Sequence, residues 1–144
     1  MITLAQYFGA KPHTPDQEYA ANDLLRRVEA LVMDYADDTG NKSHIDPDTG
    51  TEISGSKGGA GDGGFRLPTA TTGRQLSSHK EARGVDRYDP GDELDNWLDG
   101  FEGENGRNTM LEKHGLYREA PAATPGWCHL TSRAPRSGRR TFIP

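Results

Sequence analysis

Histidines and carboxylates are the residues of this sequence whose types and spacing could do chemistry. The chain contains five histidines and one cysteine, Cys128. A single cysteine excludes an internal disulfide and any multi-cysteine zinc site within one chain. A catalytic zinc ion takes three protein ligands and keeps a fourth position for water. A metal site in this chain must therefore be built from His, Asp and Glu.

Local context separates two histidines from the other three. His79 precedes Asp86 by seven positions, and the small residues Ala82 and Gly84 lie between them. A histidine on a loop can face an aspartate on the following strand across such a turn. His129 lies on a second predicted strand, which could supply a third ligand at about 2.0–2.2 Å from a shared ion.

Each of these three residues also has an ordinary explanation. His79 could be a loop histidine among charged neighbours, and Asp86 could be an acid that precedes a turn. His129 could be a buried histidine satisfied beside Trp127. If all three explanations hold, the chain is a metal-free globular domain and the spacing is accidental.

Three short blocks follow one another between residues 64 and 130. Residues 77–86, Ser-Ser-His-Lys-Glu-Ala-Arg-Gly-Val-Asp, are similar to the pattern S-x-H-x-x-G-x-A-x-D. Upstream, Gly64-Phe65-Arg66 resembles S-G-Y-R, and downstream Trp127-x-His129 resembles W-x-H. In this order, the blocks resemble those of the zinc D-Ala-D-Ala carboxypeptidases. That superfamily includes phage L-alanyl-D-glutamate endopeptidases and the hedgehog signalling domain.

The resemblance implies a role for each matching residue. His79, Asp86 and His129 would be the Zn²⁺ ligands, and Ser77 would help to orient the His79 loop. Arg66 would bind a substrate carboxylate, for which the planar guanidinium is well shaped. Zinc would lower the pKa of its bound water to about 7 and polarise the scissile carbonyl. Members of the superfamily hydrolyse peptide bonds next to D-amino acids in peptidoglycan stems.

The sequence departs from the family pattern in two places. The first motif glycine is Ala82 and the motif alanine is Gly84, so two small residues are exchanged. Bacterial members place a Glu or Asp general base three residues before the final histidine, where this chain has Gly126. A missing base would cost on the order of 10²–10⁴ in rate. Glu119 could replace it from an adjoining strand, or Arg118 and Glu119 could form a surface pair.

The clearest element that would support these residues is a helix over 15–38. Thr14 is a good N-cap, Pro15 suits the first helical position, and Gln17 completes a capping box. Gly40 ends the helix. The apolar residues recur at helical spacing and are Leu24, Val28, Leu31, Val32 and Tyr35.

Shorter elements follow, and together they predict an α+β fold. We expect a small single domain over 1–144 with a central antiparallel sheet, flanking helices and one zinc site in its 64–130 core. The remaining elements are helices at 4–8, from 92 and at 109–114, and strands at 84–88, 116–118 and 127–130. Cys128 should point away from the side chains of its strand neighbours, as a small buried hydrophobe.

Two segments are expected to lie outside the regular elements. The Gly-rich segment 54–64 leads into Phe65-Arg66-Leu67-Pro68 and not into a Lys-Ser/Thr helix start, so it is a flap or linker and not a nucleotide loop. The tail 131–144 is basic, whereas 92–104 is acidic. We favour solvated surface for both runs. The alternative for the tail is contact with an anionic polymer or a partner protein.

Composition limits the functions further. The 144 residues carry a net charge of −5, and 32% of them are hydrophobic. The net charge gives no general attraction to nucleic acid, and no segment is apolar enough to span a membrane. The N-terminus lacks the features of a signal peptide, so we expect synthesis in the host cytoplasm.

These observations lead to two expected functions. The first is a phage-encoded zinc metallopeptidase that cleaves peptidoglycan stem peptides, as an endolysin or as a peptidase carried on the virion. It would act at the cell wall or in the periplasm. The second, kept open by Gly126, is a weak or inactive zinc domain of the same fold that binds the cell wall or a virion or tail protein.

Overall fold

The computed structural model describes residues 1–55, 63–70 and 77–144 of the chain. Most of the predicted flap or linker at 54–64 therefore lies outside the described residues. In chain order the helices and strands are α1 (Leu4–Phe8), α2 (Pro15–Thr39), β1 (Gly84–Tyr88), α3 (Glu93–Asp99), α4 (Thr109–His114), β2 (Tyr117–Glu119), β3 (Trp127–Thr131) and β4 (Thr141–Phe142). A 3₁₀ turn, η1 (Ser78–Glu81), precedes β1.

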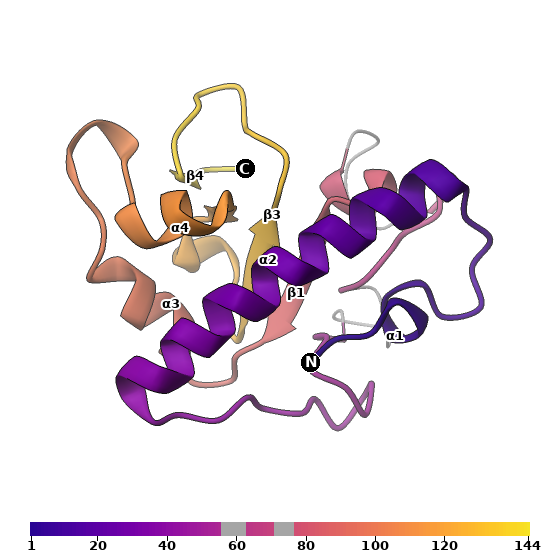
Figure 1. Cartoon of the computed structure of the whole chain (residues 1–144), viewed down its shortest axis with the longest axis horizontal. Helices are drawn as coiled ribbons and strands as arrows, with labels where there is room; N and C mark the ends of the chain where they lie inside the picture. The colour runs from indigo at the N-terminus through magenta and orange to yellow at the C-terminus, as the bar shows by residue number, and fades with distance from the viewer. Residues whose placement is uncertain (56–62, 71–76) are drawn as a thin grey trace.

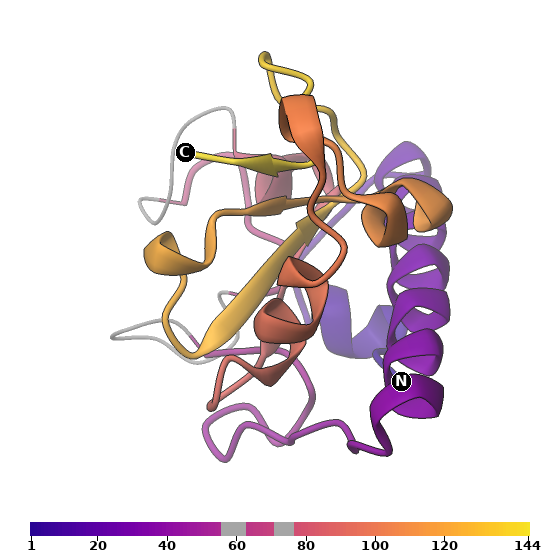
Figure 2. The ribbon, with the colours of Figure 1, turned by 90° about the vertical axis from the view of Figure 1, so that its left-hand side faces the viewer.

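Helix α2 is the longest element, and its ends are set by the sequence. The Thr14 side chain accepts a hydrogen bond from the backbone N–H of Gln17, and the Gln17 side chain accepts one from the backbone N–H of Thr14. Gly40 ends the helix in the left-handed conformation with φ +73°. In Figure 1, α2 runs diagonally across β1 and β3, and Figure 2 shows it on one side of the sheet.

The sheet has the strand order β1-β3-β2-β4. β3 pairs antiparallel with both β1 and β2, whereas β4 pairs parallel with β2. The α+β prediction is confirmed, with an antiparallel centre and one parallel edge. The expectation that 131–144 lies outside the regular elements is wrong at Thr141–Phe142, because this part of the tail forms β4 and extends the sheet.

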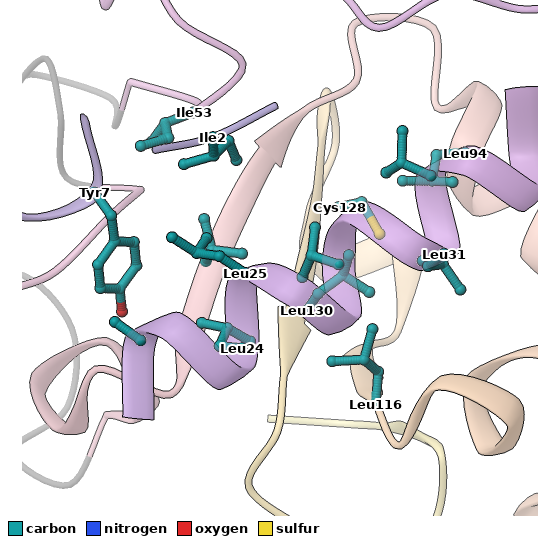
Figure 3. Packing of buried hydrophobic residues seen from close by; sticks show 14 of the residues in the cluster. Ile2, Tyr7, Leu24, Leu25, Leu31, Ile53, Leu94, Leu116, Cys128 and Leu130 are labelled. Carbon is teal, nitrogen blue, oxygen red and sulfur yellow. The ribbon is translucent and has the colours of Figure 1, made fainter. Parts of the chain in front are cut away.

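The apolar face of the sheet packs against α2 and forms the core. Leu24 and Leu31 of α2 are fully buried in one cluster with Val85, Cys128 and Leu130 of the strands. Figure 3 shows Cys128 and Leu130 beside the leucines of α2. Cys128 therefore lies in the core, as its strand position predicted. In the described part of the chain, no helix has the length and apolar character needed to cross a bilayer.

An ion cluster around a buried arginine, which we call the arginine cluster, also lies on the core side. Its cation is Arg118 of β2, whose side chain is 1% exposed. The guanidinium binds the carboxylates of Asp95, Asp99 and Glu102. The alternative of a surface pair is therefore wrong for Arg118. The solvated-surface interpretation of 92–104 is also wrong at Asp95, which is fully buried.

Candidate metal centre

The face of the sheet opposite the core carries a row of polar side chains. Asp86 of β1 is the Cα partner of His129 on β3. Extending the register of the Arg118–Leu130 pair by one residue places Glu119 beside His129. Phe142 of β4 is the Cα partner of Glu119. Directly opposite residues share a face of a sheet. Asp86, His129, Glu119 and Phe142 therefore line one row across four strands.

His79 reaches this row from the η1 turn. The Ser77 side chain caps the turn by accepting a hydrogen bond from the His79 backbone N–H at 3.3 Å. Ala82 ends the turn in the left-handed conformation, with φ 58°. The family pattern has glycine at this position, and glycine adopts positive φ at little cost. Ala82 completes the turn nonetheless, and the chain enters β1 two residues later.

The three predicted ligands meet at one point, and we call them the histidine cluster. Nδ1 of His129 lies 2.8 Å from Oδ1 of Asp86, and Nε2 of His79 lies 3.2 Å from the same oxygen. One ligand atom from each residue lies within 4.8 Å of the other two. All three residues are buried. Two imidazole nitrogens and one carboxylate oxygen are a donor set that suits a metal ion such as zinc.

The electrostatics of the cluster favour a cation beside Asp86. Burial alone would raise the pKa of Asp86, but the charges and hydrogen bonds of His79 and His129 outweigh it and hold that pKa well below its usual range. Burial alone would lower the pKa of His129, but the hydrogen bond and charge of Asp86 raise it, and the charge of Glu119 adds to the rise. The two imidazoles therefore favour the ionised form of the Asp86 carboxylate.

The segment 63–66 holds His79 in place and carries Arg66. Nδ1 of His79 lies 2.8 Å from the carbonyl oxygen of Gly64, and the backbone N–H of Arg66 donates to the carbonyl of His79. A Cβ at Gly64 would lie 2.6 Å from the carbonyl oxygen of Tyr7, so only glycine fits between α1 and the site. The predicted Gly64-Phe65-Arg66 block thus has a structural role at the centre.

Arg66 lies at the edge of the histidine cluster. Its Nη2 approaches Oδ2 of Asp86 to 3.5 Å, and its side chain is 11% exposed. This oxygen differs from the one that faces both histidines. Arg66 can therefore stay beside Asp86 while the other oxygen faces an ion.

A cleft of about 340 Å³ opens over the cluster. Its walls include the predicted Arg66 and Glu119 together with the three candidate ligands. Sequence analysis did not identify several further lining residues, namely Ser78, Ala123, Arg133, Phe142 and Pro144. Ser78 stands beside His79 at a variable motif position, and Phe142 comes from a strand that was not predicted. Neither residue carried a usable signal.

Gly126 and Glu119 occupy different places relative to the cleft. Gly126 precedes β3 with φ +91°, and its backbone N–H donates to Asp92 at 2.9 Å. It is not among the residues that line the cleft, whereas Glu119 is. Among the residues described, the cleft lining thus includes a carboxylate from β2, Glu119, and does not include Gly126.

The remaining histidines lie away from the cleft. His114 ends α4 and places Nε2 at 2.7 Å from Asp34 of α2. His13 stacks on Phe8, and His44 contacts Glu93 near the surface. These contacts separate all three from the centre.

Comparison with protein-family models, curated proteins and solved structures finds no match for this chain. The interpretation of the site therefore rests on its own geometry. A buried group of two histidines and one aspartate, His79, Asp86 and His129, could hold a metal ion at the base of a cleft.

Proposed function

We propose that this chain is a zinc-dependent peptidase that cleaves peptidoglycan stem peptides next to D-amino acids. The observation that carries the proposal is the meeting of His79, Asp86 and His129 at the base of a cleft that also contains Arg66 and Glu119. Four of these residues, Arg66, His79, Asp86 and His129, come from the blocks that carry the sequence resemblance, and Glu119 is the substitute carboxylate considered beside them.

Zinc fits the donor set better than the hard divalent cations. Mg²⁺ and Ca²⁺ prefer sets composed of oxygen ligands, whereas zinc accepts imidazole nitrogen together with carboxylate. Three protein ligands are the number that catalytic zinc sites use. When bound, zinc would supply an acidified water and polarise the scissile carbonyl. His79 already has its second ring nitrogen on a backbone carbonyl, a common outer contact of metal-bound histidine.

Arg66 would select and orient the substrate. Its guanidinium is always charged and presents a planar fork that matches a carboxylate. Because Arg66 lies beside Asp86 at the cleft wall, a substrate carboxylate held there would place a nearby peptide bond over the centre. Stem peptides carry such carboxylates close to their D-residues.

Glu119 would act as the general base. It belongs to the same cross-strand row as His129, lines the cleft, and influences the pKa of His129 through its charge. A carboxylate in this position can accept a proton from an attacking water and return it to the leaving amine. Gly126, at the usual base position of the family, has no side chain for that task.

The second candidate is a zinc-binding domain that holds cell-wall peptide, or a virion or tail protein, without cleaving it. The observation that favours it is Gly126, which leaves catalysis dependent on Glu119. In either case we propose a phage context, as a lysis enzyme or as a component of the virion. The action of the enzyme would be at the cell wall or in the periplasm.

The deciding experiment measures the release of stem-peptide fragments from isolated cell walls by zinc-loaded protein. We expect cleavage that a chelator stops and added zinc restores. Glu119→Gln should lower the rate by roughly 10²–10⁴ while zinc content stays at about one per chain. Glu18→Gln is the matched control, because Glu18 is exposed on α2 and lies outside the cleft lining.

The outcomes separate the two candidates. Zinc binding without fragment release, in the wild type, would exclude the peptidase and leave the binding domain. Full activity in Glu119→Gln would exclude Glu119 as the base. Equal cleavage of stem peptides with L- and D-residues at the cut bond would contradict the proposed substrate class.

A further inference from the structure

Ser78 makes a contact that the proposed reaction does not use. Its hydroxyl oxygen lies 3.3 Å from Nε2 of His129, on the side of the ring away from Asp86. Both residues are buried, with Ser78 6% and His129 5% exposed. We propose that Ser78 is a positioning residue that holds the His129 ring so that Nδ1 faces the metal ion. This inference rests on the proposed metal centre.

The two histidines present different nitrogens to the ion. His79 points Nε2 at Asp86 and gives Nδ1 to the Gly64 carbonyl. His129 does the reverse, with Nδ1 toward Asp86 and Nε2 toward Ser78. A neutral imidazole that binds a metal through one nitrogen carries its proton on the other. Metal-bound His129 therefore needs an acceptor for its Nε2–H, and the Ser78 hydroxyl supplies it.

A hydroxyl suits His129 better than a carbonyl would. The Gly64 carbonyl can only accept, so it fixes the His79 proton on Nδ1. The Ser78 hydroxyl can donate or accept. It can thus satisfy Nε2 of His129 when that nitrogen is protonated and when the proton lies on Nδ1, toward Asp86. The ring is held in one orientation both with and without a metal ion.

Gly84 leaves the space that this contact requires. A Cβ at Gly84 would lie 2.2 Å from the Ser78 hydroxyl oxygen and 3.1 Å from Cε1 of His129. The family pattern has alanine at this position. The exchange of alanine for glycine therefore has a structural reason in this chain: it admits the hydroxyl between β1 and the His129 ring.

The first test compares two serines of the same turn. Ser78→Ala removes the hydroxyl that reaches His129, whereas Ser77→Ala removes one that caps the His79 backbone. Zinc affinity is measured by competition with a chromophoric chelator. We expect Ser78→Ala to bind zinc about 10–100-fold more weakly, the range found when an outer partner of a metal ligand is lost. Ser77→Ala can weaken the affinity through the His79 loop, but it should leave the solvent exchange of the His129 Nε2–H unchanged.

The second test starts from the wild type. Nitrogen-15 NMR of histidine in the zinc-loaded wild type should show His129 with its proton on Nε2 and His79 with its proton on Nδ1. The Nε2–H of His129 should exchange slowly with solvent. In Ser78→Ala the same proton should exchange faster, while His79 is unaffected.

The results distinguish this inference from the proposed function. A wild type that takes up no zinc would overturn both. A wild type that binds zinc through Nε2 of His129, or a folded Ser78→Ala with unchanged affinity, would overturn only the role of Ser78. A His129 Nε2–H that exchanges equally fast in Ser77→Ala and Ser78→Ala would also overturn it, because the effect would then belong to the turn.

Discussion

The histidine cluster and the arginine cluster are two buried groups of opposite charges on the two faces of one sheet. Arg118 and Glu119 are consecutive on β2, so one side chain enters the core and the other lines the cleft. In both clusters carboxylate oxygens lie at about hydrogen-bond distance from side-chain nitrogens. They differ in the kind of nitrogen, because a histidine nitrogen can become a ligand of a metal ion and the Arg118 guanidinium cannot.

An arginine keeps its proton at every ordinary pH and offers no lone pair. Arg118 can therefore only neutralise the acids around it, and its contacts are already filled by α3 and β4. A histidine can release its proton and present a nitrogen lone pair. His79 and His129 can therefore exchange protons for a metal ion. This makes the histidine cluster a candidate metal site, whereas Arg118 has a structural role in the arginine cluster.

The two central carboxylates show the same contrast. Burial raises the pKa of Asp95 to about 6, in spite of the charge of Arg118. The pKa of Asp86 is also raised by burial, but the two imidazoles outweigh that effect and lower it. Burial thus has the larger effect on the pKa of Asp95 in the arginine cluster. The neighbouring imidazoles have the larger effect on the pKa of Asp86 in the histidine cluster.

The largest expected effect comes from removing a ligand of the histidine cluster. His79→Ala should abolish zinc uptake, because two protein ligands remain where catalytic sites have three. Metal analysis of chelator-free protein should fall from about one zinc per chain to none. His44→Ala is the matched control, since His44 contacts Glu93 near the surface. Zinc retained by folded His79→Ala would contradict the proposal that the histidine cluster is the metal site.

The next effect concerns the arginine cluster. Arg118→Met should lower the free energy of unfolding by about 3–5 kcal/mol, because it leaves Asp95 buried without its cation. Asp95→Asn should cost less, since an amide can still accept from Arg118 and carries no charge. Urea unfolding in the presence of a chelator measures both changes. Zinc affinity per folded molecule should stay unchanged, and a large loss would show that the clusters are not independent.

The smallest effect is a pH dependence of the folded chain's stability, and bound zinc should reverse its direction. Because the folded pKa of His129 is raised, its contribution to stability is fully present below about pH 6.5 and is lost as the pH rises through the folded pKa. A tenfold difference in proton affinity between the folded and unfolded chain corresponds to about 1.4 kcal/mol. Zinc competes with protons for the ligands, so zinc-bound stability should rise over the same interval. Thermal unfolding with chelator or zinc measures the two slopes, and parallel slopes would contradict the prediction.

Local signals predicted most of the fold. Capping residues and apolar spacing defined α2, and β1 and α4 agree with their predicted ranges. β4 could not be predicted, because a two-residue strand has no periodicity and depends on a parallel partner. The burial of Arg118 could not be predicted either, because the acids that neutralise it come from α3 and the turn that follows it.

The candidate site was predicted from motif order and is only partly explained by spacing. The sequence linked His79, Asp86 and His129, and the register of β1 and β3 supplies the physical reason for two of them. Ser78 escaped prediction because its contact runs across the fold to a residue 51 positions later. Serine beside a histidine carries no signal until the strands are paired.

The separation of Asp86 and His129 by 43 residues has a consequence during synthesis. The nascent chain presents His79 and Asp86 well before β3 leaves the ribosome, so an early fragment has two ligands and no partner strand. If the proposed metal centre forms, tight metal loading would follow only after the final histidine has emerged and β3 has paired with β1. Fragments that stop before residue 127 should therefore remain metal-free, however long they persist.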